Sequence, residues 1–321
     1  MAEVLSALDR RIIGALQIDG RAPWSTIAKA LDEPLRTVSR RGGDLLASGT
    51  VRVVGLANLG PTCVIEITCQ PTRLESIAEA LAEHPGVVYL LVLANPSSLL
   101  VEIHEKTFDL ATMTLSVIPA FEGVIEVSAT PVLRYYKTNA QWMPGLLDAR
   151  EVDRFELLGL PEESTGEPER LDPSDQAIVD ALEEDGRVGI TELATLAGLT
   201  EPTVRRRLAE LRTRGAFAVR TIIAPELLGF RVEACLRIEC SPAHVDTIGE
   251  MLAAVPEVRY VAQVLGQYPL VVHLNAADLP ALRQLLSAGW IGDVRSLHAS
   301  LVTRVLKRSG HSTSTLAETK S

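Results

Sequence analysis

The sequence is poor in cysteine and in aromatic residues, and it has no long apolar run. Aromatic residues make up 4% of the 321 residues. The longest apolar runs, such as 87–94, are far too short to span a bilayer, and no basic segment followed by an apolar core stands at the start. We therefore expect a cytoplasmic protein with no membrane partner.

The few cysteines argue against a metal site. The four cysteines form no CxxC pair and no histidine cluster accompanies them, so we expect small buried thiols and no metal or other cofactor. No GxSxG motif, phosphate loop or zinc-ligand spacing is present, and the six histidines are scattered along the chain. The sequence therefore predicts a protein that is not an enzyme.

What the chain does contain is an internal repeat. Asp-Gly-Arg at 19–21 recurs at 185–187, an offset of 166 residues. Further along, the offset drifts to 171, where Tyr89 matches Tyr260. Each half therefore holds a small N-terminal module followed by a larger C-terminal one, in a chain long enough for several cores.

The repeat and the composition divide the chain into domains. The larger module of each half alternates strand and helix patterns in the order βαββαβ, which predicts a ferredoxin-like sandwich and an α+β fold overall. The expected segments are a helix-turn-helix domain at 1–56, a sandwich domain at 57–138, an acidic linker at 139–170, a second helix-turn-helix domain at 171–223, a second sandwich domain at 224–308 and a disordered tail at 309–321.

The small modules carry signals for three short helices. In the second copy Asp172 precedes Pro173, and Asp175 follows where a capping-box acid belongs, so a helix is predicted to begin there. Further helices are predicted at 192–197 and 201–214, and the tight turn between them is typical of a helix-turn-helix. The strand-like segments that follow each third helix could form a small wing or a linker strand.

The third helix of the second copy is rich in arginine. Residues 200–217 hold five arginines in a chain of net charge −10. At 100° per residue Val204, Leu208 and Leu211 share one face, and Arg206 points away from it, an arrangement suited to a helix in the major groove of DNA. A solvated Arg/Glu face is the alternative. The predicted DNA contacts are Thr203, Arg205, Arg206, Arg207 and Arg212, with Arg36, Thr37, Ser39, Arg40 and Arg41 in the first copy.

The first copy of this helix looks weaker. Gly42 and Gly43 lie inside it and should each cost roughly 1 kcal/mol relative to alanine. Gly42 also removes the core contact that Leu208 makes in the second copy. We therefore expect Arg206→Ala to weaken specific DNA binding by about 1–3 kcal/mol and Arg40→Ala to do less, and we expect an asymmetric operator.

The overall charge of the modules favours the opposite order. Residues 1–60 carry eight basic and six acidic residues, a net charge of +2. Residues 171–229 carry seven basic and ten acidic residues, a net charge of −3. We give the local arginine face more weight, because salt screens charges beyond about 8–10 Å.

Taken together these patterns resemble the Lrp/AsnC family of feast/famine transcription regulators. The matching residues are the LDxxDxxIxxxLxxDGR opening at 171–187, the third helix with Val204 and Arg207, and the HPGV-like segments at 84–87 and 255–258. The resemblance implies winged-helix-like DNA-binding domains and sandwich domains of the RAM/AsnC type, which bind a small effector, commonly an amino acid. It also implies a homo-oligomer, a dimer or larger, formed through the sandwich-domain sheets. Whether the two sandwich domains pair within one chain or between chains is open.

The resemblance also suggests where an effector would bind. In the family a Gly-x-x-Asp loop between the second and third strands lines the site, but here Pro269 replaces the acid. An ordinary hairpin turn is the alternative reading of this loop. The candidate effector residues are Tyr260, Gly266, Gln267 and Tyr268 in the second copy, with Asn95, Ser97 and Ser98 in the first.

Other functions remain as alternatives. Siroheme decarboxylases look similar to this family, but the histidines and arginine of their HNYxRxHxYNLWF-like stretch are missing from the aligned segments here, apart from an uninformative arginine at 259. A ligand sensor that has lost DNA binding is a further alternative, because of the glycines in the first copy and the acidic second module.

Overall fold

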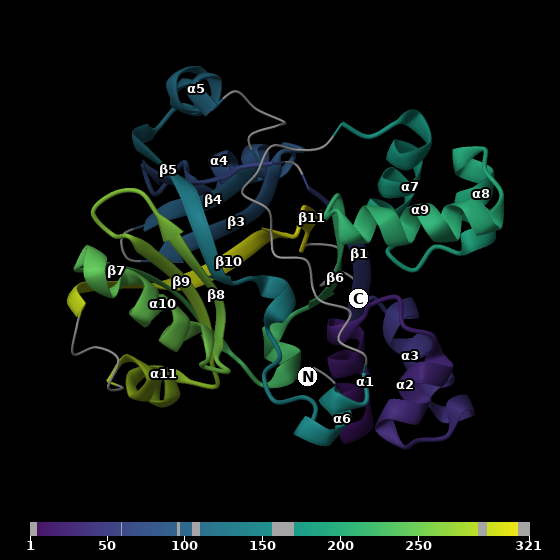
Figure 1. Ribbon diagram of the computed structural model, residues 1–321. Helices are drawn as coiled ribbons and strands as arrows, with labels where there is room; N and C mark the ends of the chain where they lie inside the picture. Colours follow the sequence, from purple (N-terminus) through teal and green to yellow (C-terminus); the bar gives the residue numbers. More distant parts are fainter. Residues whose placement is uncertain are drawn as a thin grey trace.

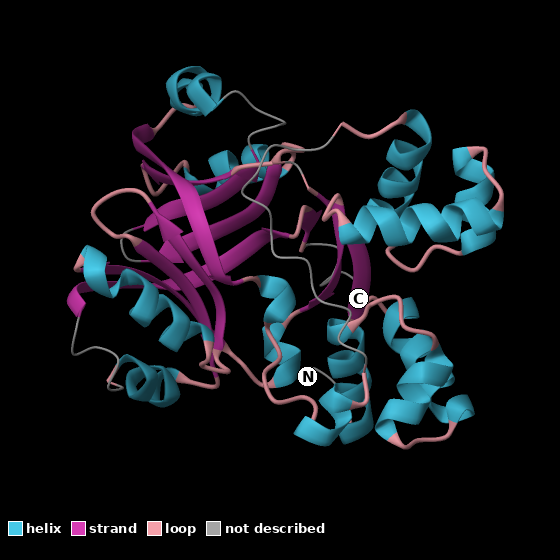
Figure 2. Ribbon diagram, viewed as in Figure 1, coloured by secondary structure: helices cyan, strands magenta, loops and turns pink. Residues whose placement is uncertain are grey.

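Helical modules lie on one side of the molecule and a β-barrel lies on the other (Figure 1). The computed structural model describes residues 5–58, 60–94, 97–104, 110–155, 170–287 and 294–313. Figure 2 shows the strands gathered at the left and most of the helices at the right. The predicted α+β fold with a duplicated pair of domains is confirmed. None of the described helices is long and apolar enough to cross a membrane.

Each helical module packs its helices around a core of its own. The capping residues explain where the first helices begin: the Ser6 hydroxyl accepts a hydrogen bond from the Asp9 amide, and the Asp172 carboxylate accepts one from the Asp175 amide at 2.8 Å. The predicted start at Asp172 is therefore confirmed. The helices are α1 (Ala7–Ile18), α2 (Trp24–Leu31) and α3 (Leu35–Ala47) in the first module, and α7 (Pro173–Glu184), α8 (Ile190–Ala197) and α9 (Glu201–Thr213) in the second.

Gly42 is a packing position in α3. A Cβ atom placed on Gly42 would lie 2.3 Å from Cζ3 of Trp24, so the indole ring occupies the space beside the glycine. The prediction that Gly42 leaves a core contact missing is therefore wrong, because Trp24 supplies the contact that Leu208 makes in α9. A Cβ atom placed on Gly43 would have no atom within 4 Å, apart from its chain neighbours and the backbone of its own helix, in the part of the chain that the structure describes.

Each helical module is followed by one strand, and these two strands pair with each other. β1 (Val51–Ala57) and β6 (Phe217–Ile223) are antiparallel, with Val51 opposite Ile223 and Ala57 opposite Phe217. At the centre Val54 faces Arg220, and the internal repeat, with its offset of 166 residues, relates the same two positions. A pseudo-twofold axis therefore passes between these strands and relates the two modules.

The two sandwich domains join edge to edge into a closed barrel. In the described part of the chain the sheet order is β11-β10-β3-β4-β2-β5-β8-β9-β7, and β7 also pairs with β10. The first domain contributes β2 (Thr62–Cys69), β3 (Val87–Ala94), β4 (Ser97–His104) and β5 (Val124–Lys137). The second contributes β7 (Val232–Cys240), β8 (Val258–Val264), β9 (Leu270–Ala276) and β10 (Val294–Arg308), extended by β11 (His311–Ser312).

The helices of the sandwich domains cover the outside of this barrel, and a separate core fills its inside. The outer cores form beneath α4 (Leu74–Ala82) in the first domain and beneath α10 (Val245–Ala253) and α11 (Leu279–Leu286) in the second. The inner core contains Tyr89 and Tyr260 among aliphatic side chains. The counterpart of α11 is a broken segment, with α5 (Leu110–Thr112), a π-helical turn at Met113–Val117 and a 3₁₀ turn at Ile118–Ala120.

Pairing between the domains follows the pseudo-twofold axis. β5 pairs with β8 and β10 pairs with β3. The question of how the sandwich domains pair is thereby answered, because they pair within one chain. The strand edges of the two described sandwich-domain sheets are used within the chain, and the homo-oligomer through these sheets stays a prediction.

Two predicted boundary segments also differ. The first part of the acidic linker is not a linker, because Trp142, Leu146 and Phe155 are buried in the core of the first helical module and α6 (Ala149–Asp153) lies against it. Residues 156–169 lie outside the described part. The disordered tail is wrong for 309–313, because β11 pairs with β10 there, and 314–321 lie outside the described residues. Short 3₁₀ turns complete the described elements at Asn139–Gln141, Pro225–Leu228 and Pro242–His244.

Candidate nucleic-acid interface

The third helices α3 and α9 present matching faces. Val204, Leu208 and Leu211 are buried in the second module, as their spacing predicts. Val38, Gly42 and Leu45 occupy the same positions in the first. Arg206 and Arg40 are exposed on the opposite side, with side chains 62% and 64% accessible. The outward direction predicted for these two arginines is therefore correct.

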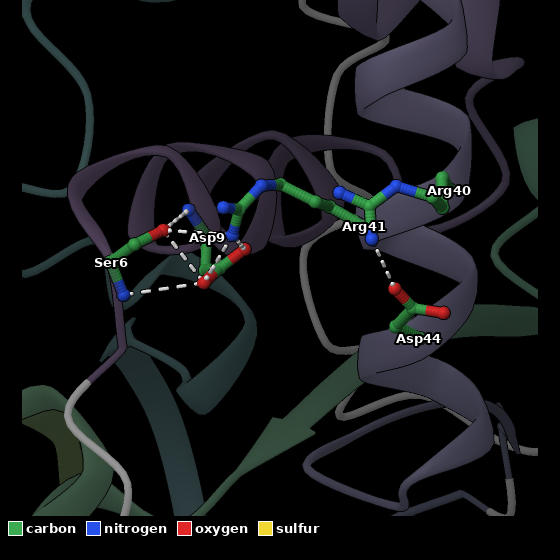
Figure 3. A network of polar contacts seen from close by, with 5 residues as sticks. All are labelled: Ser6, Asp9, Arg40, Arg41 and Asp44. Atoms are coloured by element: carbon green, nitrogen blue, oxygen red, sulfur yellow. Dashed lines mark hydrogen bonds and ion pairs between the residues drawn. The ribbon is translucent and has the colours of Figure 1, made fainter.

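The neighbouring arginines turn inward. Arg41 donates to Asp9 at 2.9 Å and to the Ser6 hydroxyl at 3.1 Å, so it joins α3 to the start of α1 (Figure 3). Arg207 makes the equivalent contacts in the second module, to Asp172 at 2.5 Å and to Asp175 at 2.8 Å. Hydrogen bonds from Arg207 lower the pKa of Asp172. These arginines fix the third helix against the first helix and do not point outward with Arg40 and Arg206.

The outward arginines of α9 pair with acids on the same helix. Arg206 contacts Glu210 at 2.6 Å, and Arg205 lies 3.5 Å from Glu201. Exposed pairs of this kind one turn apart contribute only about 0.3–0.5 kcal/mol each, so they open easily. The two carboxylates nevertheless cancel the charge of the two arginines on the surface that would face DNA.

The corresponding face of α3 is less neutralised. Arg40 contacts Asp44 at 3.0 Å, as Figure 3 shows, but Arg36 makes no ion pair within the part of the chain that the structure describes. Leu35 stands at the start of the helix and is 51% exposed. An exposed leucine there suits contact with a thymine methyl group.

Three of the remaining candidate DNA residues make contacts within the protein. The Ser39 hydroxyl donates to the Arg36 carbonyl at 3.3 Å, and Thr203 lies 2.9 Å from the Thr200 hydroxyl. Thr37 is half-buried beside them. Arg212 lies 4.0 Å from Asp19 of the first module, so it connects the two modules.

The modules are also joined by a reciprocal exchange of arginines. Arg21 donates to the carbonyls of Gly186 at 2.5 Å and Val188 at 3.0 Å. Arg187 donates to the carbonyls of Gly20 and Ala22, and its guanidinium lies 4.4 Å from the ring centroid of Trp24. Burial lowers the pKa of both arginines. The two helical modules therefore hold one fixed arrangement.

The candidate effector residues do not form one site. Gly266 has a φ of +119° in the hairpin between β8 and β9, where Gln267 is exposed and Tyr268 half-buried. Tyr260 is 1% exposed inside the barrel, six residues away along the strand, which is about 20 Å. In the first domain Ser97 is exposed and Ser98 is buried at the start of β4, and Asn95 lies outside the described residues.

The sequence reading missed a group of charged residues inside the barrel. Arg237 pairs with Glu66, which is its counterpart at the repeat offset of 171, and it also donates to the Ser300 hydroxyl at 2.8 Å. Arg308 pairs with Glu233 and donates to the Tyr89 hydroxyl. Charged residues at alternate positions of apolar strands, as in VEACLRIEC, are the signal that would have revealed them.

Two helix-turn-helix modules and a two-domain α/β barrel place the chain in the class of helix-turn-helix proteins with an added α/β sandwich domain. A model of the AsnC-type helix-turn-helix domain matches residues 5–44 and 171–212, and a model of the Lrp/AsnC ligand binding domain matches 233–311. The chain belongs to the Lrp/AsnC family of transcriptional regulators.

Relatives of known sequence agree with this assignment. The HTH-type transcriptional regulator FL11 of Pyrococcus furiosus is 30% identical over 139 residues, which is 92% of that protein and 43% of this chain. The HTH-type transcriptional regulator LrpA of Mycobacterium tuberculosis is 34% identical over 122 residues, which is 80% of that protein and 37% of this chain. These relatives therefore each correspond to less than half of the chain.

A solved structure shares the duplicated architecture. The siroheme decarboxylase NirDL has a TM-score of 0.64 with this chain over 97% of both chains, at 14% sequence identity. At this identity the likeness concerns the fold alone. It shows that the order of modules and their pairing within one chain occur in another protein.

Proposed function

We propose that the protein is a sequence-specific DNA-binding regulator in which one chain supplies both recognition helices, α3 in the first reader and α9 in the second. The proposed regulator responds to a small-molecule effector and is not an enzyme. The pairing of β1 with β6 carries this proposal. Its register relates α3 to α9 by a pseudo-twofold axis, as the two subunits of a dimeric regulator are related. Two recognition helices in this arrangement fit two half-sites of one operator without a second chain.

The two readers differ where they would touch bases. Leu35 and Arg36 at the start of α3 correspond to Glu201 and Pro202 at the start of α9, at the repeat offset of 166. Direct readout depends on the side chains at such positions. The operator is therefore not a palindrome, and the protein binds it in one orientation.

The first reader contributes more of the affinity. Its outward face has Arg36 and Arg40 against Asp44, whereas the outward arginines of α9 each lie beside a glutamate. This assignment is the reverse of the one that the arginine count favours. The difference arises because Glu201 and Glu210 each lie beside an outward arginine of α9.

Operator selection and two double variants test the proposal. An operator is first selected from random DNA, and its affinity is measured by electrophoretic shift over a salt series. We expect Arg36→Ala/Arg40→Ala to weaken binding more than Arg205→Ala/Arg206→Ala, and to relax specificity in one half-site only. Equal effects of the two double variants would remove the claim of a dominant first reader. Selection of a perfect palindrome would remove the claim of unequal readers.

The effector site is proposed at the surface hairpin between β8 and β9. The match to a ligand-binding domain model supports effector binding, and the exposed Gln267 and half-buried Tyr268 offer polar contacts. Pro269 in place of an acid favours a ligand other than a free amino acid with an unpaired ammonium group. A thermal-shift screen of metabolites tests this, because a ligand of the folded state raises the melting temperature. A metabolite that raises the melting temperature of the Tyr268→Ala/Gln267→Ala variant as much as that of the unmodified protein would show that the site lies elsewhere.

A homo-oligomer is proposed through the outer surface of the barrel. Leu133, Leu265 and Leu301 are 40–52% exposed there, while the strand edges are used within the chain. Light scattering should give a mass that is a multiple of 34.7 kDa, reduced to one chain by Leu133→Glu/Leu265→Glu. A single-chain mass for the unmodified protein contradicts this part of the proposal.

The likeness to a siroheme decarboxylase makes enzyme activity the second candidate. The missing histidines and arginine of the decarboxylase stretch count against it. Incubation of the purified protein with siroheme distinguishes the two functions. An unchanged absorption spectrum and product profile supports the regulator, and loss of carboxyl groups from siroheme would establish the enzyme.

A further inference from the structure

One end of the barrel interior holds a buried arginine without a carboxylate partner. Arg259 is 6% exposed, donates from Nε to the Asn139 side-chain oxygen at 2.8 Å and lies 4.8 Å from the ring centroid of Trp142. Its Nη1 atom is buried and has no hydrogen-bond partner. Among the described residues it makes no ion pair, although a buried charge is costly unless it is paired.

β9 pairs with β8, where His273 lies opposite Tyr260, the residue that follows Arg259, and two residues of β9 bring further unused donors to the same end. His273 is 6% exposed and Asn275 is 1% exposed, and both belong to the face of the strand that points into the barrel. Both ring nitrogens of His273 and the side-chain nitrogen of Asn275 are buried without partners. The His273 ring stacks on Tyr260, with 4.8 Å between centroids, and so its position is fixed.

The charges at this end do not balance. Arg308 is compensated by its ion pair with Glu233. Burial, reinforced by Arg259 and Arg308, lowers the pKa of His273 to about 3, so the imidazole is neutral at pH 7. Glu233 and Glu226 act electrostatically on Arg259, but within the described part of the chain neither forms an ion pair with it, so the buried guanidinium has no carboxylate in contact.

We propose that this end of the barrel binds a small monovalent anion, held by Arg259 Nη1, Asn275 Nδ2 and a ring N–H of His273. A halide and a small carboxylate share the required chemistry, since each accepts several hydrogen bonds and carries one negative charge. The anion supplies a counter-charge in contact with Arg259, whose guanidinium is stacked on Trp142, and the Trp142 indole N–H donates to the Pro256 carbonyl.

The internal repeat does not duplicate the site. At the repeat offset of 171, Arg259, His273 and Asn275 correspond to Val88, Glu102 and His104. Neither the arginine nor the amide is repeated, and an acid replaces the histidine. The site is separate from the hairpin proposed for the effector, and it does not depend on DNA binding.

Diffraction from crystals of the full chain grown in bromide, and separately in formate, tests the proposal directly. Bromide replaces chloride and gives an anomalous signal. We expect a bromide peak, a formate molecule or both within hydrogen-bond distance of Arg259 and Asn275. Bromide alone assigns a halide site and formate alone assigns a carboxylate site. Water or empty space at this position in both crystals would overturn the proposal.

Melting temperatures provide a second, independent measurement. Chloride or formate is titrated at constant ionic strength against the bulky sulfonate MES. We expect a saturable rise in melting temperature for the unmodified protein and for the exposed control Arg134→Gln, and no rise for Arg259→Gln. An equal rise in all three proteins, or none in any of them, contradicts a specific site at Arg259.

Discussion

Arg21 and Arg187 each donate two hydrogen bonds to backbone carbonyls beside the other. They are counterparts at the repeat offset of 166, and they follow the glycines at which α1 and α7 have ended. The exchange crosses the pseudo-twofold axis that the pairing of β1 with β6 defines. The Asp-Gly-Arg motif therefore acts between the halves as well as within each of them.

Replacement of either arginine should loosen this connection. Hydrogen bonds from a charged group contribute about 1.5–3 kcal/mol, so we expect Arg21→Ala and Arg187→Ala each to lower the free energy of unfolding by about 2 kcal/mol. Urea unfolding measures the loss. Arg150→Ala, at an exposed position on α6, is the control and should change little. A loss no larger than that of the control would show that the exchange is not stabilising.

The two glycines of α3 should respond in opposite ways to alanine. Gly43→Ala meets open space and should raise the free energy of unfolding by about 0.5–1 kcal/mol, because alanine is the better helix former. Gly42→Ala should lower it, because the new methyl group would meet the Trp24 ring at 2.3 Å. Thermal unfolding of the two variants compares them under one set of conditions. Stabilisation by both would mean that Trp24 moves aside freely.

Removal of the acids on α9 should strengthen DNA binding. Glu201→Gln/Glu210→Gln releases Arg205 and Arg206 and removes two negative charges from the surface proposed to face phosphates. We expect an increase in affinity of about fivefold at low salt that shrinks as salt rises. Electrophoretic shift over a salt series measures it. Glu79→Gln, on α4 of the barrel, is the control, and an equal gain there would indicate a general charge effect.

A buried lysine should make stability depend on pH in the alkaline range. Burial lowers the pKa of Lys137 to about 8, from the ordinary lysine pKa of 10.5. Between these two values the unfolded chain binds the proton and the folded chain does not, so this residue makes stability rise with pH from about 8 to 10.5. The contribution of Lys137 is measured as the difference in unfolding free energy between the unmodified protein and Lys137→Met, which should rise from pH 8 to 10.5 in urea unfolding. The same difference for Lys29→Met, at an exposed position, should stay constant. A constant difference for Lys137→Met would contradict the prediction.

Local patterns were sufficient to predict much of the fold. The caps at Asp172 and the apolar stripe of Val204, Leu208 and Leu211 depend on neighbouring residues only, and both are confirmed. The order of strands and helices in each half follows from the same kind of signal. The pairing between the two halves could not be predicted from such local patterns, because the register of β5 with β8 depends on contacts between residues far apart in the sequence.

The inward arginines show why the candidate site was harder to predict. A helical projection gives the angle of Arg207 on α9 but says nothing of the acids that α7 places beside it. Asp175 was predicted to be the capping-box acid of α7. In the structure its backbone N–H donates to Asp172, and its carboxylate accepts a hydrogen bond from Arg207. The role of Trp24 beside Gly42 was invisible for the same reason, since the two residues lie on different helices.

The closure of both halves into one barrel has a consequence for how such a protein can change. In a dimer of identical chains each substitution occurs at two related places, so a change that helps one half-site also alters the other. Here a substitution occurs once. The partners also never separate on dilution, because a covalent chain keeps them at a high effective concentration. Arg259 and Val88, related by the repeat and chemically unlike, illustrate the freedom that this gives to each half.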